Sequence, residues 1–434
     1  MEMQSLSEPL ALARTVRQLG IDDSNTLRLA YLLVRETVRR RNLIDKFINQ
    51  ATKPKTVDEY DLGVQAFLRL YVYQTRIAKN WTEFNIEEAE SIAKQARSIL
   101  GWKTLHEVEA ILGSLLTQEP TSVFENVSDT EKIGLQTFHP SWFVDYCFRL
   151  FGRPETITML EADTEQSPTY VRLNTLKADE NEIQQMLSQE GVRIEKVEQL
   201  KHTYRVVSTK WSLTRAESAR EGLFCVQDKA SCFAAEAANP VPGKTVLDVC
   251  SAPGAKTTYL AQLMNNSGTL LSVDYSKRRI EVWKNEVARM GVEIAEPIIA
   301  DARYHLPLKS EADIVVLDPP CTSIGVFRKL PSAKWRLTAQ SIDRMAGIQW
   351  QMLENCAENV KAGGTLVYST CSITVEENEM LIERFLKTNM EFSLAEITPK
   401  IGLPGLRGLD SCQRLYPHIH QCNGFFIARL AKED

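Results

Sequence analysis

Residues 245–264, TVLDVCSAPGAKTTYLAQLM, run from an apolar segment through a turn at Pro253 and Gly254 into a helix-like segment. The pattern predicts a strand followed by a helix, the unit from which α/β sheets are built. Glycine lets the backbone approach a ligand closely, and the first amides of the next helix point at the same space. Neither the GxGxxG pattern nor a Walker loop is present, so this turn alone is weak evidence for a nucleotide-like cofactor.

The chain from residue 221 to residue 434 repeats this alternation of strand and helix. Its apolar runs have strand length and its amphipathic runs have helix length, which predicts a doubly wound, mostly parallel, Rossmann-like sheet. The strand-like runs are 268–275, 295–302, 312–320 and 364–371, and the helix-like runs include 276–291 and 339–360. Ligands of such sheets lie beyond the carboxyl ends of the strands, so we expect the functional residues there.

The preceding residues divide by pattern into three parts. Residues 1–117 carry apolar positions at intervals of three and four with few glycines, which predicts an all-helical domain. The periodicity lapses over residues 118–137, where we expect a linker. Residues 138–220 show a helix, then strand, helix and two further strands, which predicts a small α+β segment.

The composition of the 434 residues is that of an ordinary soluble globular protein, with 44% hydrophobic and 25% charged residues. The N-terminal stretch lacks a basic-then-apolar signal layout, and no run approaches 18 apolar residues. We therefore expect a cytoplasmic protein, a monomer with no membrane partner. The net charge of -5 favours a partner bound in local grooves over one held by a global positive field.

The nine cysteines and six histidines limit the redox and metal chemistry that the chain can support. No two cysteines form a CxxC pair, which argues against a zinc ribbon, and the histidines are dispersed, so we assign no metal. An odd number of cysteines without a secretion signal argues for reduced thiols. Most such thiols are buried and inert, so a reactive cysteine needs independent support.

Acidic residues follow the second and third strands of the predicted sheet. Asp274 stands 20 residues after Gly254, where a carboxylate can accept both hydroxyl hydrogens of a ribose. Asp274 could equally cap the helix that follows. Asp301 is placed to meet the edge of an adenine. Because the chain has no phosphate-binding lysine–serine pair, these strand ends favour S-adenosylmethionine over ATP.

The next two strands end in a carboxylate and two thiols: Asp318 and Cys321 in DPPCTSIG, and Cys371 in STCS. Enzymes that methylate exocyclic amines often carry an aromatic residue where Cys321 stands, so the thiol favours a carbon that must first be activated. A thiolate that adds to carbon 6 of cytosine makes carbon 5 nucleophilic enough to attack a methyl donor. Asp318 could stabilise the charge on the base, which must leave its stack or come from a single-stranded loop.

The residues themselves leave the attacking thiol open. A lone Cys371 would more simply be a buried structural thiol, but Cys321 and Asp318 at the same sheet edge favour catalysis. Either thiol could reach a flipped base. The acidic residues 376–379 most simply start the next helix, where carboxylates suit the helix dipole. Lys256 could bind the carboxylate of the cofactor or cap a surface turn.

Two basic clusters could contact RNA. The first comprises Arg35, Arg39, Arg40 and Arg41, for which a solvated helix face is the alternative. The second follows the DPPCTSIG loop, and its alternative is a packed tryptophan with solvated lysines. It comprises Arg328, Lys329, Lys334, Trp335 and Arg336.

Several motifs in this order resemble those of the Sun (Fmu-type) RNA cytosine-5 methyltransferases, over residues 135 to 434. They are HPSW (139–142), VRLNTLK (171–177), VQDKASC (226–232), DVCSAPGAKT (248–257), DPPCTS (318–323), LVYSTCS with EENE (366–379), and RLYPHIHQCNGFFIARL (414–430). The helical region upstream is similar in size and position to the NusB-like RNA-binding domain of RsmB. The resemblance implies methylation of carbon 5 of a cytosine in structured RNA, and the helical domain favours rRNA over tRNA as the partner.

The resemblance also implies a role for each matching residue. Cys371 would be the nucleophile, Cys321 would help to release the methylated RNA, and Asp318 would lie near the methyl donor and the base. Residues 138–220 would be an RNA-binding segment, and 221–434 the S-adenosylmethionine-dependent domain. The implied cofactor-binding residues are Cys250, Ser251, Ala252, Pro253, Gly254, Ala255, Lys256, Asp274, Asp301 and Asp318.

The sequence departs from the family pattern at two loops. DPPCTS replaces the usual DAPCSG, with Pro319 and Ser323 in place of smaller residues, and Ala255 replaces a glycine of the cofactor loop. These changes affect the expected loop shape more than the activity, because both thiols and all the acids are retained. Two other functions stay open: an RNA-binding ribosome-assembly factor without turnover, and an exocyclic-amine methyltransferase that forms no thiol adduct.

Overall fold

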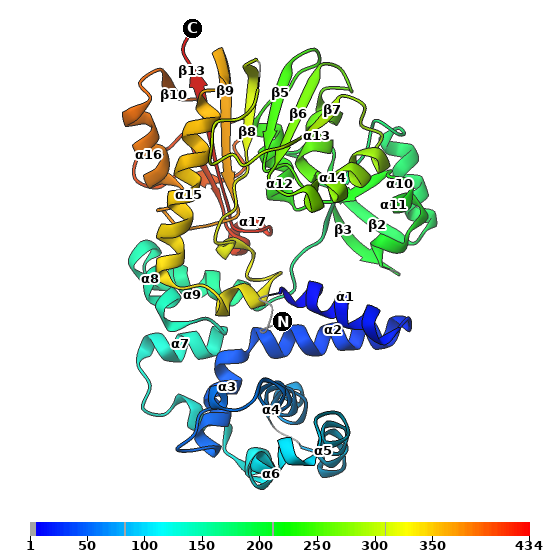
Figure 1. Ribbon diagram of the computed structural model, residues 1–434, viewed down its shortest axis with the longest axis vertical. Coiled ribbons are helices and arrows are strands. Elements are labelled where there is room, and N and C mark those ends of the chain that lie inside the picture. Colours follow the sequence, from blue (N-terminus) through cyan, green and yellow to red (C-terminus); the bar gives the residue numbers. More distant parts are fainter. Residues whose placement is uncertain (1–5, 82–83, 211, 309) are drawn as a thin grey trace. The chain divides into compact units, whose positions relative to one another are not determined.

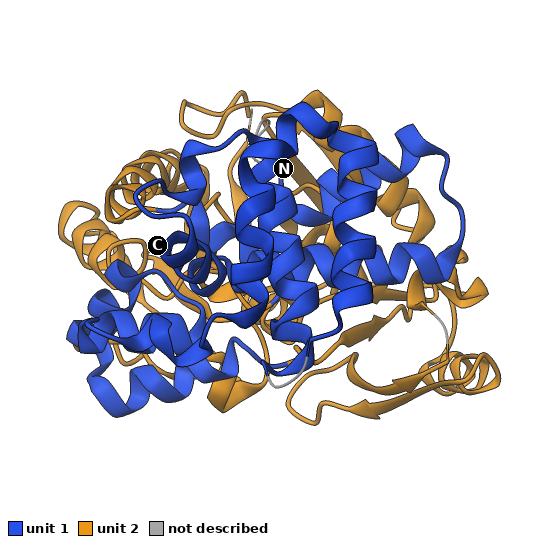
Figure 2. Ribbon diagram, turned by 90° about the horizontal axis from the view of Figure 1, so that it is seen from below, with its two compact units in different colours: residues 1–165, 329–337 blue, residues 166–328, 338–434 orange. Residues whose placement is uncertain are grey.

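The computed structural model describes residues 6–81, 84–210, 212–308 and 310–434. The predicted helical domain thus includes residues 1–5 and 82–83 that lie outside the description. Two compact units make up the chain, residues 1–165 with 329–337, and residues 166–328 with 338–434 (Figure 2). Within the described ranges, no helix is both long and apolar enough to span a membrane.

The first unit is built of helices, as the apolar spacing predicts (Figure 1). Its apolar side chains, such as Phe47, Leu68 and Val108, meet in one buried cluster. The helices are α1 (Glu8–Leu19), α2 (Ser24–Arg39), α3 (Arg41–Ala51), α4 (Leu62–Thr75), α5 (Ile86–Leu100), α6 (Trp102–Thr117), α7 (Asp129–Thr137), α8 (Ser141–Phe151) and α9 (Arg153–Ala162).

The segment 118–137 is not the linker that we expected. It contains a 3-10 helix, Pro120–Phe124, and α7, and its side chains Val123 and Leu135 are buried in the helical core. The lapse in periodicity comes from the short length of these helices, which offer too few turns to show an apolar stripe. Helices α8 and α9 also pack within the helical unit, so the first compact unit extends to residue 165 rather than 117.

Most residues of the two basic clusters are buried or half-buried. Arg39 is buried and donates to the carbonyl of Thr164 at 2.7 Å, and Arg41 pairs with Asp45 at 3.2 Å. Lys334 is fully buried and donates to the carbonyl of Phe138 at 3.2 Å, because residues 329–337 fold into the helical unit. These cations are therefore packed and hydrogen-bonded within the helical unit. The pattern of charges along the sequence does not reveal this placement.

Trp335 and Arg328 of the second cluster follow the same trend, whereas Arg336 does not. Trp335 is half-buried and donates its indole N–H to the carbonyl of Val38 at 2.6 Å, so it is packed as the alternative proposed. Arg328 is buried and donates to the carbonyl of Gln166 at 2.6 Å. Arg336 is exposed.

A small antiparallel sheet opens the second unit, in the order β2-β3-β1-β4, with helices α10 and α11 beside it (Figure 1). The strand, helix, strand, strand order matches the prediction for this part of the chain. Its elements are β1 (Tyr170–Leu173), α10 (Glu180–Gln189), β2 (Val192–Lys196), β3 (Thr203–Thr209), α11 (Glu217–Arg220) and β4 (Phe224–Val226).

The predicted Rossmann-like sheet has the order β11-β12-β13-β9-β8-β5-β6-β7, and β10 also pairs with β13. Strands β5 to β9 are parallel, as expected for buried apolar runs, and β13 closes antiparallel on β9. The strands are β5 (Thr245–Val249), β6 (Thr269–Asp274), β7 (Ala295–Ile299), β8 (Ala312–Leu317), β9 (Val360–Thr370), β10 (Phe392–Leu394), β11 (Leu403–Pro404), β12 (Gln413–Leu415) and β13 (Phe425–Lys432). The helices are α12 (Lys229–Ala237), α13 (Ala255–Leu263), α14 (Lys277–Arg289), α15 (Ala339–Ala357), α16 (Glu379–Thr388) and α17 (Pro417–His420).

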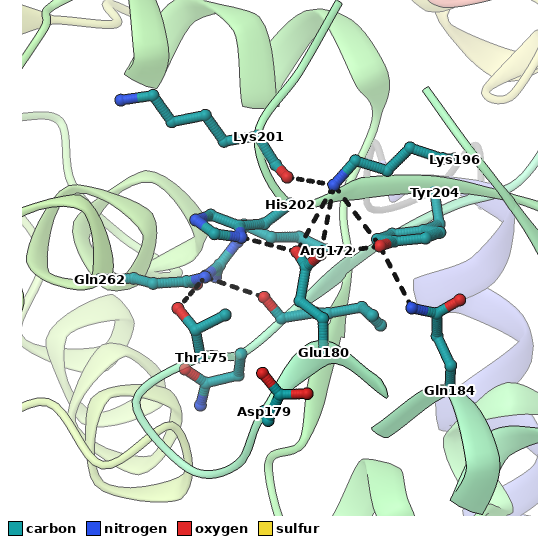
Figure 3. A network of polar contacts seen from close by, with 12 residues as sticks. Arg172, Thr175, Asp179, Glu180, Gln184, Lys196, Lys201, His202, Tyr204 and Gln262 are labelled. Atoms are coloured by element: carbon teal, nitrogen blue, oxygen red, sulfur yellow. Dashed lines mark hydrogen bonds and ion pairs between the residues drawn. The ribbon is translucent and has the colours of Figure 1, made fainter. Parts of the chain in front are cut away.

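Arg172 joins the small sheet to the helix that carries the candidate cofactor loop. It is fully buried on β1 and donates to Gln262 and, at 2.8 Å, to Thr258 Oγ1, both on α13. Figure 3 shows Arg172 and Gln262 beside a second polar network, in which Glu180 accepts hydrogen bonds from His202 and Tyr204. A buried guanidinium with several fixed acceptors favours one arrangement of the small sheet on this helix.

Candidate active site

Two cysteine side chains meet at the carboxyl ends of β8 and β9. Because these strands are parallel neighbours, Cys321 after β8 and Cys371 after β9 come to the same edge of the sheet. Their Sγ atoms lie 3.1 Å apart, and both residues are partly exposed. The structure thus brings together the two thiols that the sequence places 50 residues apart.

Asp318 and Lys256 form an ion pair beside the thiols. Lys256 Nζ lies 2.5 Å from Asp318 Oδ2, and Ser369 Oγ lies 3.4 Å from the other carboxylate oxygen. The ammonium also stands over the ring of Phe425, 5.6 Å from its centroid. Lys256 is buried, so it does not cap a surface turn, and in this structure its carboxylate partner is Asp318.

The surroundings shift the pKa values of the two thiols in opposite directions. The hydrogen bond with Cys371, burial and the nearby carboxylate of Glu377 raise the pKa of Cys321 well above its usual range. The hydrogen bond with Cys321 lowers the pKa of Cys371, and Ser323 and the ammonium of Lys256 act in the same direction against burial and Asp318. Cys371 is therefore the thiol that ionises more readily.

Ser323 occupies a strained position in this loop. Its backbone has φ of 57°, in the left-handed region that favours glycine, and the related family pattern has glycine at this point. Its hydroxyl lies 3.6 Å from Cys371 Sγ and 3.9 Å from Cys321 Sγ. The serine thus adds a polar group to the thiol pair at a left-handed backbone position.

The candidate cofactor loop lies between β5 and α13. Cys250 and Gly254 both have left-handed φ values, 65° and 113°, so the chain turns sharply before the helix N-terminus. A Cβ on Gly254 would stand 3.3 Å from the Trp283 ring. The loop leaves two buried oxygens, Asp248 Oδ1 and Ser251 Oγ, with no hydrogen-bond partner among the described residues. Such atoms suit a polar ligand at a helix N-terminus.

Asp274 at the end of β6 is buried and organises this loop. Its carboxylate accepts the amides of Ala252 at 3.3 Å and Ser276 at 3.1 Å, and Arg279 stands 3.2 Å away. The alternative role as helix cap is wrong, because Ser276 is the N-cap of α14. Asp274 therefore ties the cofactor loop to the end of β6.

Asp301 follows β7 and forms an ion pair with Arg303. Both of its oxygens accept from Arg303, at 2.6 to 3.1 Å, and this contact lowers its pKa. The carboxylate is thus held ionised near the surface.

Asp248 contrasts with Asp301, because burial raises the pKa of Asp248 to about 7 while Thr257 Oγ1 donates to it at 2.5 Å.

The acidic run 376–379 does not simply start a helix. Helix α16 begins at Glu379, which is fully buried and paired with the equally buried Arg414, with oxygens 2.5 and 2.7 Å from the guanidinium. Glu377 is also fully buried, directly behind the thiols. Sequence reasoning missed Glu377, because only the fold brings it against the loop that follows Cys321.

The sheet, the strand-end acids and the thiol pair together define a Rossmann-like methyltransferase. Residues 235–431 match the family described as 16S rRNA methyltransferase RsmB/F, and residues 139–209 match its ferredoxin-like domain. The chain belongs to this Sun family of methyltransferases, as the resemblance implied.

Three relatives illustrate the extent of the match. The chain is 28% identical, over its whole length and 96% of the relative, to the probable ribosomal RNA small subunit methyltransferase B of Bacillus subtilis (strain 168). It is 36% identical to the tRNA (cytosine(72)-C(5))-methyltransferase of Pyrococcus horikoshii, over 51% of this chain and 55% of that protein. The solved structure of PH0851 superposes with a TM-score of 0.81 at 30% identity, covering 97% of this chain and 93% of that one.

Proposed function

We propose that this protein transfers a methyl group from S-adenosylmethionine to carbon 5 of a cytosine in structured RNA, through a covalent adduct with Cys371. The observation that carries the proposal is the pair of thiols, 3.1 Å apart, beside the carboxylate of Asp318. An enzyme for an exocyclic amine needs no thiol in its site, and a non-catalytic factor needs no such pair.

The chemistry follows from the positions of these side chains. The thiolate of Cys371 adds to carbon 6 of the flipped cytosine, and the ring becomes an enamine whose carbon 5 attacks the donor methyl group. Asp318, held by Lys256, stabilises the charge that moves onto ring nitrogen 3 and the exocyclic amine. Loss of the carbon 5 proton to a base then expels the thiolate of Cys371, and Cys321 assists the release of the RNA.

The loop from Cys250 to Lys256 and Asp274 would hold the cofactor, with Asp301 on the adenine side. Bound S-adenosylmethionine supplies an electrophilic methyl group. The buried oxygens of Asp248 and Ser251 that lack partners among the described residues, together with the N-terminus of α13, suit the polar parts of such a ligand. Cofactor titration monitored by tryptophan fluorescence tests this assignment without RNA, since Trp283 adjoins Gly254.

An rRNA is the favoured substrate over a tRNA. The relative that matches the whole chain, helical region included, is named for ribosomal RNA, whereas the tRNA enzyme matches about half of it. We propose that the helical unit, residues 1–165, and the small antiparallel sheet of strands β1 to β4 bind the RNA. Bisulfite sequencing of total RNA from a deletion strain identifies the cytosine, and a lost tRNA signal with intact rRNA would refute the preference.

RNA that contains 5-fluorocytosine tests the adduct. The fluorine cannot leave carbon 5 as a proton does, so the enzyme should become covalently trapped on this RNA. Cys371→Ala should abolish trapping, whereas Cys321→Ala should still trap RNA and should slow its release after ordinary turnover. Trapping by the Cys371→Ala variant would show that the roles of the two thiols are reversed.

A further inference from the structure

One buried carboxylate binds both of the loops that carry the thiols. Glu377 is fully buried, and its Oε1 accepts the amide N–H of Thr322 at 2.8 Å. Its Oε2 accepts the hydroxyls of Thr322 and Ser372, each at 2.5 Å. Thr322 follows Cys321 directly and Ser372 follows Cys371 directly, so one side chain holds the residue next to each thiol.

Two more donors complete the shell of Glu377. Thr374 Oγ1 donates at 2.8 Å, and Gln349 Nε2 on α15 donates at 2.9 Å while also bonding the carbonyl of Pro320 at 3.0 Å. Five neutral donors converge on one carboxylate, an arrangement that keeps a buried charge in place through hydrogen bonds. Gln349 thus holds the carbonyl before Cys321, and Glu377, to which Gln349 also donates, holds the amide after it.

Two groups of opposite charge, Glu377 and Lys256, act on the thiol pair. Glu377 contacts the residue after each thiol and raises the pKa of Cys321, while Lys256 is paired with Asp318 and lowers the pKa of Cys371. Tyr368 on β9 donates to the backbone carbonyl of Glu377 at 2.7 Å and brings no charge of its own.

Arg414 and Glu379 carry the next charges near Glu377. Arg414 on β12 donates to the carbonyl of Ile373 at 2.9 Å, but its charge is matched by Glu379 at 2.5 Å. Glu377 therefore raises the pKa of Cys321, whereas Cys371 is under the two opposing charges of the Asp318–Lys256 pair.

We propose that Glu377 is a positioning residue that gives the two thiols different roles, by clamping both loops in register and by placing a negative charge next to Cys321. This inference rests on the proposed function for its catalytic meaning. The carboxylate disfavours a second negative charge at Cys321, in agreement with the raised pKa of that thiol, so Cys371 attacks and Cys321 keeps its proton for the release step.

Site-resolved alkylation of the full-length chain tests the inference without RNA or cofactor. Initial rates of iodoacetamide modification are measured at each cysteine by peptide mass spectrometry, from about pH 6 to pH 10, where thiols titrate. In the natural chain Cys371 should react first at every pH. Equal or faster modification of Cys321 would overturn the assignment.

Glu377→Gln removes the charge and keeps the shape, because the three hydroxyls can turn to accept from the new amide. The alkylation rate of Cys321 at a fixed pH should rise about tenfold, which corresponds to a pKa lower by about one unit. Glu376→Gln, the same change at the half-buried neighbouring acid, is the matched control and should leave the profile of Cys321 unchanged. A correctly folded Glu377→Gln chain with an unaltered Cys321 profile, or an equal shift in the control, would overturn the inference.

Methyl transfer provides the second readout. Glu377→Gln should lower kcat at least about tenfold, while KM for the RNA stays within about twofold, since the thiols rather than the RNA contacts are altered. If the alkylation shift occurs but the natural chain methylates no RNA, the positioning role stands and the proposed function fails. If the alkylation shift is absent while methylation proceeds, the function stands and the positioning role fails.

Discussion

Lys256 Nζ lies 2.5 Å from Asp318 Oδ2, so the lysine of the cofactor loop and the carboxylate of the catalytic loop form one ion pair. Lys256 comes from the first turn of α13, which follows β5, and Asp318 comes directly after β8; β5 and β8 are adjacent parallel strands. It places a cation within reach of Cys371 and a carboxylate at the same sheet edge. The two charges have opposite effects on the thiol, and each can be removed separately.

Lys256→Met should make Cys371 a weaker acid. The ammonium lowers the pKa of Cys371, so its removal raises that pKa and reduces the thiolate fraction at neutral pH. Alkylation of Cys371 at about pH 7.5 should slow roughly tenfold, and the pH–rate profile for methyl transfer should move upward by about one unit. Lys284→Met, at an exposed lysine of α14, is the control and should show neither effect. An unchanged Cys371 profile would contradict this electrostatic role.

Asp318→Asn should have two opposite effects. Its negative charge raises the pKa of Cys371, so the variant should alkylate faster at Cys371. Methyl transfer should nevertheless fall by about 10² or more, because the carboxyl group that stabilises the charged base is lost. Parallel assays of alkylation and methyl transfer on one preparation separate these effects. Faster alkylation with unimpaired methyl transfer would exclude Asp318 from the chemistry.

Mild oxidation should cross-link the thiol pair. The Sγ atoms of Cys321 and Cys371 are 3.1 Å apart, and a disulfide needs about 2.05 Å, so only a small movement separates them from a bond. Diamide accepts the two electrons and two protons that are released. Methyl transfer should be lost and should return with dithiothreitol, and peptide mapping should identify the Cys321–Cys371 link.

Cys321→Ser tests the specificity of this oxidation. The variant should keep its own pre-treatment rate after diamide, whereas Cys412→Ser, at a buried cysteine just before β12, should stay sensitive. Equal inactivation of the Cys321→Ser variant would show that another cysteine is responsible.

The buried lysine of the helical unit should make local stability depend on pH. Burial lowers the pKa of Lys334 from 10.5 to about 7, with Asp163 and Glu36 opposing this shift and Arg39 and Arg40 reinforcing it. His139 faces the same site, and burial together with Lys334 lowers its pKa to about 4.

The sign follows from the proton count. Between about pH 7 and pH 10 the unfolded chain binds a proton at Lys334 that the folded chain does not. The free energy of unfolding therefore rises with pH in this range, with a slope of up to about 1.4 kcal/mol per pH unit. Hydrogen exchange of α8, corrected for intrinsic rates, measures this slope. Lys334→Met should flatten it, and Lys94→Met, at an exposed position of α5, should not. A slope retained in Lys334→Met would assign it to another group.

Much of the fold and of the candidate site could be predicted from local pattern. The apolar runs that became β5 to β9 are continuous in the sequence, and parallel strands share one carboxyl edge, so Asp274, Asp318, Cys321 and Cys371 could be assigned to that edge without coordinates. The segment 118–137 was predicted less well, because its helices are too short to show a period and their burial depends on distant residues such as Phe47.

The sequence by itself determined which side chains reach the working edge of the sheet, since the periods of strands and helices are local properties of the chain. Only the tertiary structure decided their partners. It paired Lys256 with Asp318, buried Glu377 behind two thiols, and folded Lys334 into the helical unit. The physical reason is that burial and hydrogen-bond partners are set by segments far apart in the chain, as the 50 residues between Cys321 and Cys371 illustrate.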